Sequence, residues 1–176
     1  MASAQRTLPD CVFCKIATGN DPATDIVFRN ERMCIFKDIR PASDFHYLAI
    51  PNHHVENVNS LTVADKPLLE ELKRELVSYM RSKDVDPSQA SFGFHIPPFT
   101  SVKHLHLHAI APVSRMGFIS RMIFRPNTMW FKTVRAVLSV NRINVLRYVC
   151  FISSFRMKLL CKPFPTITQP SDMCFV

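Results

Sequence analysis

The sequence predicts an α+β domain: an antiparallel sheet with a helix packed on one face. Two observations indicate this class. Several short apolar segments are bounded by turn residues, which is typical of strands. One longer segment has apolar residues at three- and four-residue spacing, which is typical of an amphipathic helix. Because strand-like segments stand on both sides of that helix, we expect strand–strand–helix–strand–strand order and an antiparallel sheet.

The elements follow from local patterns. After a lead at 1–10, which we expect to be disordered, short apolar runs predict strands at 26–28, 33–36, 45–50, 91–95 and 104–111. Pro51 stops the third of these strands. The helix is predicted over 65–83, with Asp65 or Thr62 as its N-cap and Pro67 tolerated in the first turn. Its apolar stripe consists of Leu68, Leu69, Leu72, Leu76, Val77 and Met80.

The charge divides the chain into two parts. Residues 1–114 carry 12 basic and 13 acidic side chains, whereas residues 115–176 carry ten basic ones and a single acid, Asp172. We expect a domain over 11–137 and a basic, hydrophobic tail of unknown structure over 138–176. A basic tail alone is weak evidence of an anionic partner, and without a recognisable nucleic-acid module we do not expect nucleic acid to bind.

Composition excludes several classes of protein. The three glycines, Gly19, Gly93 and Gly117, are too scattered for a dinucleotide loop or a P-loop. No apolar run reaches the roughly 18–20 residues that span a bilayer, so no membrane association is expected. The start lacks the apolar core of a secretory signal. We therefore expect a cytoplasmic location, with the nucleus also open, and six cysteines that act as thiols or metal ligands.

The segment His104-Leu105-His106-Leu107-His108 carries the chemistry. In a strand, alternate side chains share one face, so three imidazoles would lie together. Two interpretations compete: a His-x-His pair that binds zinc, or an imidazole that attacks phosphorus and forms a covalent intermediate. Cys11-x-x-Cys14 is separately half of a zinc site.

This segment resembles the signature of the histidine triad (HIT) family. Further similarity to the nucleotide-binding branch of that family lies in segments spread over about residues 11–135; they are Cys11–Ile16, Phe36–Ile39, His46–Pro51, Phe94–Phe99 and Met129–Phe131. The resemblance implies a HIT-like fold, a symmetric homodimer and hydrolysis of purine nucleoside 5′-phosphoramidates to release AMP. It implies no cofactor for the chemistry.

The resemblance also assigns roles to residues. His106 would attack the α-phosphate and carry the nucleotidyl group, and His108 would bind the phosphate oxygens. His104 would orient His106, Ser101 would aid the leaving group, and His46 would lie close by. Where many relatives have an asparagine that contacts phosphate, this chain has His95, which we do not expect to be essential.

Nucleotide and metal contacts follow from the same resemblance. Asp38 is the expected ribose ligand, because a carboxylate accepts hydrogen bonds from both ribose hydroxyls. An apolar slot for the base would consist of Val12, Phe13, Ile16, Phe36 and Ile39. Some family members hold structural zinc, and the matching ligands here are Cys11, Cys14, His54 and His104.

Three rival functions stay open at this point. Two are enzymatic: hydrolysis of dinucleoside polyphosphates, and removal of AMP from blocked nucleic-acid ends. The third is a non-catalytic nucleotide sensor that keeps the fold and serves as an interaction module.

Overall fold

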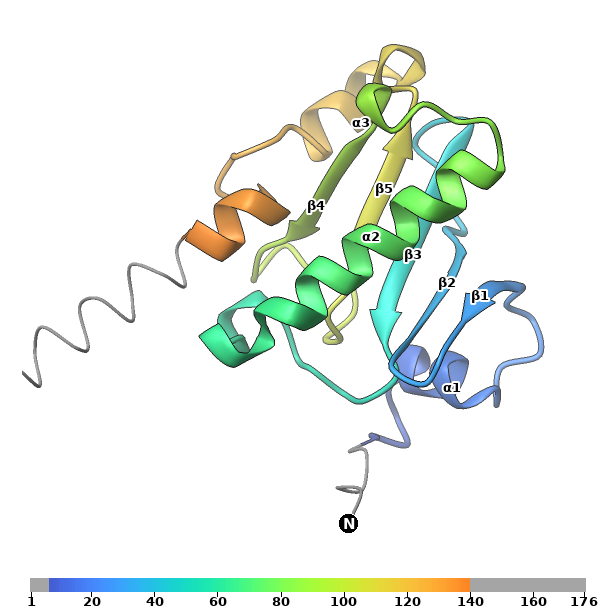
Figure 1. Cartoon of the computed structure of the whole chain (residues 1–176). Coiled ribbons are helices and arrows are strands. Elements are labelled where there is room, and N and C mark those ends of the chain that lie inside the picture. Colours follow the sequence, from blue (N-terminus) through green and yellow to red (C-terminus); the bar gives the residue numbers. More distant parts are fainter. Residues whose placement is uncertain (1–6, 140–176) are drawn as a thin grey trace, which may run out of the picture. The chain divides into compact units, whose positions relative to one another are not determined.

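The fold is built on one antiparallel sheet, seen in a computed structural model that describes residues 7–139. Six strands follow the order β1-β2-β3-β5-β4-β6 (Figure 1). They are β1 Ile26–Arg29, β2 Met33–Lys37, β3 Phe45–Pro51, β4 Ser91–His95, β5 Leu107–Ala111 and β6 Phe131–Thr133. The predicted α+β class is therefore confirmed.

Three α-helices and four single 3₁₀ turns connect the strands. They are α1 Val12–Thr18, α2 Lys66–Ser82, α3 Phe118–Ile123, η1 Val58–Ser60, η2 Val63–Asp65, η3 Pro87–Gln89 and η4 Val113–Arg115. Residues 134–139 are also helical up to the end of the described part. Helix α2 crosses one face of the sheet, as predicted, and Figure 1 shows it running across β3 and β5.

The start of α2 differs from the prediction in one detail. Asp65 Oδ2 accepts hydrogen bonds from the Thr62 backbone N–H and hydroxyl at 2.7 and 2.8 Å. These two bonds cap the short turn η2, and Asp65, which is also the N-cap residue of α2, accepts no hydrogen bond from the first turn of α2. Pro67 stands in the first turn of α2, where its missing N–H costs nothing.

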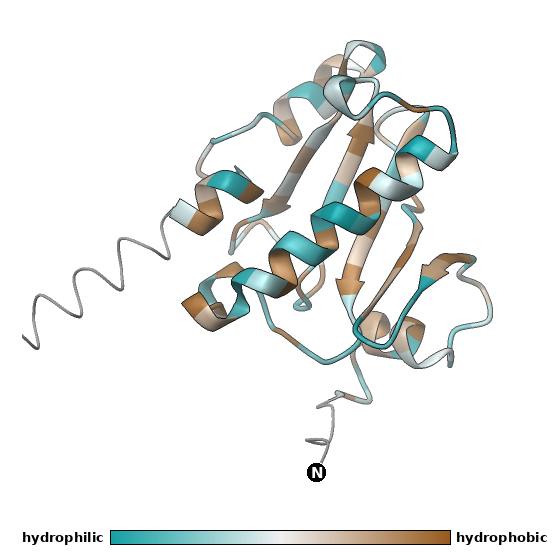
Figure 2. Ribbon diagram, viewed as in Figure 1, coloured by the Kyte–Doolittle hydropathy of each residue, from teal (hydrophilic) through white to brown (hydrophobic). Residues whose placement is uncertain are grey.

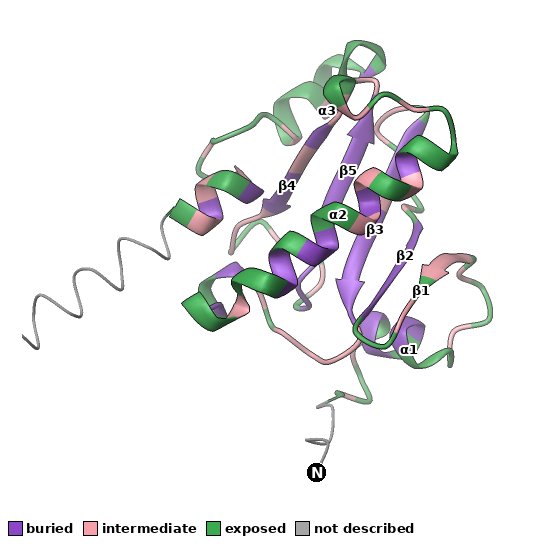
Figure 3. Ribbon diagram, viewed as in Figure 1, coloured by how far each residue is buried: buried purple, intermediate pink, exposed green. Residues whose placement is uncertain are grey.

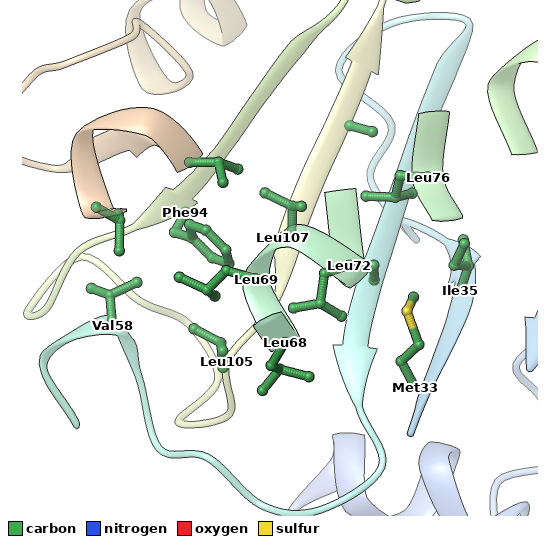
Figure 4. Packing of buried hydrophobic residues seen from close by; sticks show 14 of the residues in the cluster. Met33, Ile35, Val58, Leu68, Leu69, Leu72, Leu76, Phe94, Leu105 and Leu107 are labelled. Carbon is green, nitrogen blue, oxygen red and sulfur yellow. The ribbon is translucent and has the colours of Figure 1, made fainter. Parts of the chain in front are cut away.

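The sheet face beneath α2 forms the main apolar core. Alternation along the strands brings Met33, Ile35, Ala49, Phe94 and Leu107 to this face. The predicted stripe of α2 packs onto them except for Val77, which lies outside this core, and Figure 4 shows the leucines of α2 pointing toward the sheet. The outer side of α2 is hydrophilic and exposed, whereas the central strands β2, β3 and β5 are largely apolar and buried (Figures 2 and 3).

The opposite face of the sheet is mixed. On the side of β2 and β3 it holds a second apolar cluster, in which Phe13 and Ile16 of α1 pack on Phe36, Leu48 and Ile50. On the side of β5 and β4 the same face carries imidazoles instead. One sheet thus separates a dry apolar layer from a polar one.

Three features of the fold were not predicted. Strand β5 begins at Leu107, so His104 and His106 precede it, and the expected strand over 104–111 is too long. Helix α3 and strand β6 arise in the segment after the triad, for which no element was predicted. The first segment, 12–18, is helical.

The predicted domain limits are only partly covered by the structure. Most of the predicted lead, 1–10, and of the predicted tail, 138–176, lies outside the described residues. Val134 and Val137 are buried in the main core, so the folded part reaches at least to the predicted limit at 137. Among the described helices, none is long and apolar enough to cross a bilayer.

Candidate active site

Four histidines form one cluster on the sheet face opposite α2. We call His46, His95, His106 and His108 the imidazole cluster. The ring of His108 lies at its centre, with centroids 5.2 Å from His46, 5.0 Å from His95 and 5.0 Å from His106. The pairing of β3 and β5 sets His46 opposite Ile110, and the pairing of β4 and β5 sets Gly93 opposite His108.

Hydrogen bonds assign the protons on His46 and His108. The backbone N–H of Ala42 donates to His46 Nδ1 at 3.0 Å, so the proton of a neutral His46 is on Nε2. That nitrogen donates to His108 Nδ1 at 2.9 Å. The proton of His108 is therefore on its own Nε2, a buried atom without a partner in the described structure. A buried donor without an acceptor is costly, so this N–H is suited to an anionic ligand.

His106 is held in the complementary tautomer. Its Nδ1–H donates to the backbone carbonyl of His104 at 2.6 Å, which leaves the lone pair on Nε2. The ring of Phe13 makes an edge contact with it, with centroids 5.2 Å apart. His106 and His108 thus offer opposite functions side by side: a lone pair on one ring and an N–H on the other.

The cluster is neutral at physiological pH. Burial lowers the pKa of His106 and lowers that of His108 well below the ordinary value, with neighbouring imidazoles adding to the shift of His108. Burial also lowers the pKa of His46 to about 4, although the Asp38 carboxylate opposes this shift. A neutral imidazole is the form that can act as a nucleophile.

Asp38 lies at the edge of this cluster. Its Oδ1 accepts the Arg40 backbone N–H at 2.8 Å, the loop-capping contact common for Asp. Its Oδ2 lies 3.4 Å from His46 Nε2 and 3.9 Å from His108 Nδ1. The side chain keeps 15% of its surface exposed, so its oxygens can still accept further hydrogen bonds. Its role as ribose ligand stays a prediction.

The structure places the predicted apolar slot in two parts. Phe13, Ile16 and Phe36 are buried in the second apolar cluster. In contrast, Val12 is 44% exposed and Ile39 is 90% exposed, so these two present apolar surface to solvent. The slot as a whole therefore stays a prediction.

Ser101 lies apart from the imidazole cluster. It is exposed and lines a surface depression together with Cys11, Val12 and His54. The predicted contact with a leaving group therefore stays a prediction.

His104 belongs to a different group from the other two triad histidines. Its Nδ1 lies 3.4 Å from Cys11 Sγ and 3.5 Å from Cys14 Sγ, and His54 Nδ1 lies 3.4 Å from Cys14 Sγ. We call Cys11, Cys14, His54 and His104 the thiol cluster. The expectation that all three triad rings share one strand face is wrong, because the chain before Leu107 is not extended in the sheet.

The thiol cluster has the shape of a tetrahedral metal site. Its four ligand atoms lie within 4.8 Å of one another. Zn–S and Zn–N bonds of about 2.3 and 2.0–2.1 Å at tetrahedral angles require S–N edges of about 3.5 Å, which matches the three sulfur–nitrogen contacts. The Pro51 carbonyl accepts the Nε2–H of His104 at 3.1 Å and so points the Nδ1 lone pair at the sulfurs.

A second group, Asp38 with His46 and His108, also has ligand atoms close together. Here the two imidazole nitrogens are 2.9 Å apart, which is a hydrogen-bond distance and shorter than the edge of about 3.4 Å between two nitrogens of a tetrahedral zinc site. His108 Nδ1 is thus engaged by His46, and the roles of His106 as nucleophile and of His108 as phosphate ligand stay predictions.

Comparisons with known proteins show which family this chain is similar to. The model of the family described as "Scavenger mRNA decapping enzyme C-term binding" matches residues 10–123. A Mus musculus protein named "Adenosine 5'-monophosphoramidase HINT3" is 39% identical over 73% of this chain and 79% of its own length. A crystal structure of a HIT family hydrolase from Legionella pneumophila covers 58% of this chain and 92% of its own, with TM-score 0.55 and 29% identity.

This chain belongs to the histidine triad family. Another family relative, from Arabidopsis thaliana, is 41% identical over 57% of this chain and 69% of its own length, and is named "Bifunctional adenosine 5'-phosphosulfate phosphorylase/adenylylsulfatase HINT4". The names of the two relatives thus refer to different bonds at an adenosine phosphate: one to a phosphoramidate, the other to a phosphosulfate.

Sequence reasoning missed two aromatic residues of this histidine triad site. The ring of Phe124, just after α3, lies 5.3 Å from His46, 5.2 Å from His95 and 5.3 Å from His108. The ring of Phe131 in β6 lies 5.2 Å from His95. The sequence singles out Phe131 only as part of the family segment Met129–Phe131 and does not single out Phe124 at all, because the elements around them are too short for a periodic signal.

Proposed function

We propose that this protein is an adenosine 5′-monophosphoramidase, which hydrolyses the P–N bond of purine nucleoside 5′-phosphoramidates. The observation that carries the proposal is the pair of opposite tautomers, with a lone pair on His106 Nε2 beside a buried, partnerless N–H on His108. The similarity to relatives named for this activity supports the choice of bond.

In the first step, His106 Nε2 attacks the α-phosphorus. The N–P bond to the histidine forms while the P–N bond to the amine breaks. The leaving nitrogen keeps the electron pair and takes up a proton from solvent water, and the water that attacks in the second step returns one proton to the solvent. His108 Nε2–H donates to a phosphoryl oxygen on which charge increases in the transition state. A neutral nucleophile suits an anionic phosphoramidate, because a carboxylate would repel it.

In the second step, water attacks the nucleotidyl-histidine. Its oxygen bonds to phosphorus, the bond to His106 Nε2 breaks, and AMP leaves. The His104 carbonyl stabilises the covalent intermediate, because it accepts the Nδ1–H of a ring that becomes cationic on nucleotidylation. In the same proposal, Asp38 accepts from the ribose hydroxyls and His46 orients His108. The predicted role of Ser101 at the leaving group is not part of it, because Ser101 lines a depression on the side of Cys11 and Val12.

We also propose that the thiol cluster binds one structural zinc ion. Two thiols and two imidazoles are a donor set that zinc prefers, and burial lowers the pKa of His104 to about 4, which keeps its Nδ1 free to coordinate. Bound zinc would tie α1 to the segment before β5. No step of the reaction uses it, and no organic cofactor is required.

A homodimer in the cytoplasm, with access to the nucleus, completes the proposal. The free thiols of Cys11, Cys14 and Cys34 support a reducing compartment. Light scattering on the purified full chain tests the dimer, and a mass of one chain at micromolar concentration would contradict it.

The function is tested by turnover of AMP joined through nitrogen to an amine. Wild type should release AMP, and His106→Ala should reduce the rate by about 10⁴-fold or more, since it removes the nucleophile. Rapid quenching with labelled substrate should trap the nucleotide on His106. Tight AMP binding without turnover would indicate a nucleotide sensor. Faster cleavage of a diadenosine polyphosphate or an adenylated nucleic-acid end would indicate one of the rival hydrolases.

A further inference from the structure

A pocket beside the imidazole cluster has no role in the mechanism above. Its volume is about 390 Å³, and its lining is His95, Phe99, Met122, Ile123 and Trp130. Four of these five residues are apolar, and Phe99 and Met122 expose 53% and 52% of their surface. Such open apolar surface at a site of chemistry is typical of a ligand subsite.

The walls of the pocket are fixed by specific contacts. The indole N–H of Trp130 donates to the Met122 carbonyl at 3.1 Å, which ties the segment before β6 to α3. The rings of Trp130 and Phe99 meet edge to face, with centroids 6.3 Å apart. The pocket is therefore largely formed before any ligand enters, which reduces the entropy lost on binding.

His95 joins this pocket to the site. Its ring lies 5.0 Å from that of His108 at an angle of 89°. Its Nδ1 lies 3.3 Å from the Trp130 carbonyl, which can only accept, so Nδ1 carries the proton. His95 Nε2 therefore has a lone pair, and the ring presents a hydrogen-bond acceptor where the pocket meets the imidazole cluster.

The order of the rings identifies the part of the substrate that this pocket faces. Phe13, His106, His108 and His95 form a row with successive centroid distances of 5.2, 5.0 and 5.0 Å. The apolar slot proposed for the base lies at the Phe13 end. The reacting phosphate belongs beside His106 and His108, in the middle. The His95 end then receives the group on the other side of the phosphate, which is the leaving amine.

We propose that this pocket binds an apolar, preferably aromatic, substituent of the leaving amine, and that His95 Nε2 accepts a hydrogen bond from its N–H. This rests on the proposed phosphoramidase function. A phosphoramidate nitrogen with one substituent has a hydrogen to donate, whereas the bridging oxygen of a phosphate ester or anhydride has none. His95 is thus a specificity residue that favours N–H amidates, and the pocket selects among the amines.

Three substrates separate these effects: AMP amidated with ammonia, with 2-phenylethylamine, and with N-methyl-2-phenylethylamine. The first lacks the apolar substituent, and the third lacks the N–H. Wild type should cleave the phenylethyl amidate with kcat/KM about tenfold or more above that of the ammonia amidate, since burying the ring contributes binding energy in the pocket.

Phe99→Ala tests the pocket, and Phe118→Ala is its matched control. Phe118 is also an exposed phenylalanine, at 79%, but it does not line the pocket. Phe99→Ala should reduce the ratio of kcat/KM for the phenylethyl amidate to that for the ammonia amidate to about threefold or less. Phe118→Ala should keep the wild-type ratio. An unchanged preference in Phe99→Ala would refute the pocket.

His95→Phe tests the acceptor, because it keeps an aromatic ring against Phe124 and Phe131 and removes both nitrogens. It should lower kcat/KM for the phenylethyl amidate about tenfold more than for its N-methyl counterpart. An equal loss on both would mean that His95 only supports the packing, and would overturn its assignment. Suppose that the ammonia amidate is cleaved in a reaction that requires His106, but that the kcat/KM ratios between amidates are the same in the variants and in wild type. Then the subsite is refuted and the proposed function stands. If no amidate is cleaved, both fail.

Discussion

His104 and His106 are two residues apart and use opposite ring nitrogens. His104 donates from Nε2 to the Pro51 carbonyl and turns its Nδ1 lone pair to two sulfurs. His106 donates from Nδ1 to the His104 carbonyl and keeps its lone pair on Nε2. The histidines His104 of the thiol cluster and His106 of the imidazole cluster thus differ in which ring nitrogen donates a hydrogen bond to a backbone carbonyl. The residue type alone does not decide between a metal ligand and a nucleophile.

A substitution in the imidazole cluster should reduce activity without changing the zinc content of the thiol cluster, and it has the largest expected effect of the changes that compare the two clusters. His108→Phe keeps a ring in the centre of the imidazole cluster and removes the N–H for the phosphoryl oxygen. We expect kcat/KM to fall about 10²–10³-fold, as on loss of one preorganised donor, while zinc content stays at the wild-type level. AMP release and metal analysis on the same sample check this. Loss of zinc in this variant would mean that the clusters are not independent.

The reverse experiment removes a thiol. Cys14→Ser should abolish zinc binding and lower the free energy of unfolding by about 3 kcal/mol, the stabilisation that a metal provides at roughly a hundredfold excess over its dissociation constant. Cys34→Ser is the matched control, since Cys34 is also buried but lies outside the thiol cluster. Denaturant melts with and without chelator provide the measurement. Equal chelator sensitivity of Cys14→Ser and wild type would contradict the zinc site.

A substitution at Gly93 tests whether the packing of the Phe131 ring supports the imidazole cluster. A Cβ on Gly93 would lie 2.4 Å from the Phe131 ring, which packs against His95 and His108. Gly93→Ala should therefore cost about 1–3 kcal/mol of unfolding free energy, as in other overpacked cores, and reduce activity without loss of zinc. Gly117→Ala is the control, because a Cβ there meets nothing within 4 Å. Similar thermal midpoints for both variants would refute this account.

The smallest effect is a pH dependence of stability. The pKa of His46 is lowered to about 4 by burial, so between pH 6.5 and 4 the unfolded chain binds a proton that the folded chain excludes. Stability therefore falls as the pH decreases, by about 1 kcal/mol for this group between pH 7 and 5.5. Denaturant melts across this range check the sign. In His46→Phe the change of unfolding free energy with pH should be smaller than in wild type. An unchanged pH dependence would mean that other groups cause the effect.

Much of the fold could be predicted because apolar residues recur at a regular spacing along its longer elements. The bounds of α2 and β4 follow from apolar spacing, and the structure confirms them within a residue or two. The stripe of α2 is confirmed except at Val77, which is only partly buried and lies outside the core. The start of β5 could not be predicted in this way. His104 and His106 alternate as strand residues do, but their hydrogen bonds to carbonyls and their contacts with α1 hold the chain outside the sheet.

The residues of the candidate site could be predicted better than their arrangement in space. His46, His106 and His108 do come together, and Cys11, Cys14, His54 and His104 converge as the resemblance implied. The separation of His104 from the other triad rings depends on backbone carbonyls, which carry no sequence signal. The closure by Phe124 and Phe131 depends on elements of six and three residues, too short to be detected by period.

The pairing of β3 with β5 makes activity a reporter of correct folding. His46 and His108 lie on the face opposite Ala49 and Leu107, so the same register sets both the site and the core. A slip by one residue would turn the imidazoles under α2 and the apolar residues outward. A molecule with misregistered central strands would therefore lose its catalytic group and its core in a single event. The specific activity of a preparation should therefore be proportional to the fraction of molecules whose β3 and β5 are paired in the correct register.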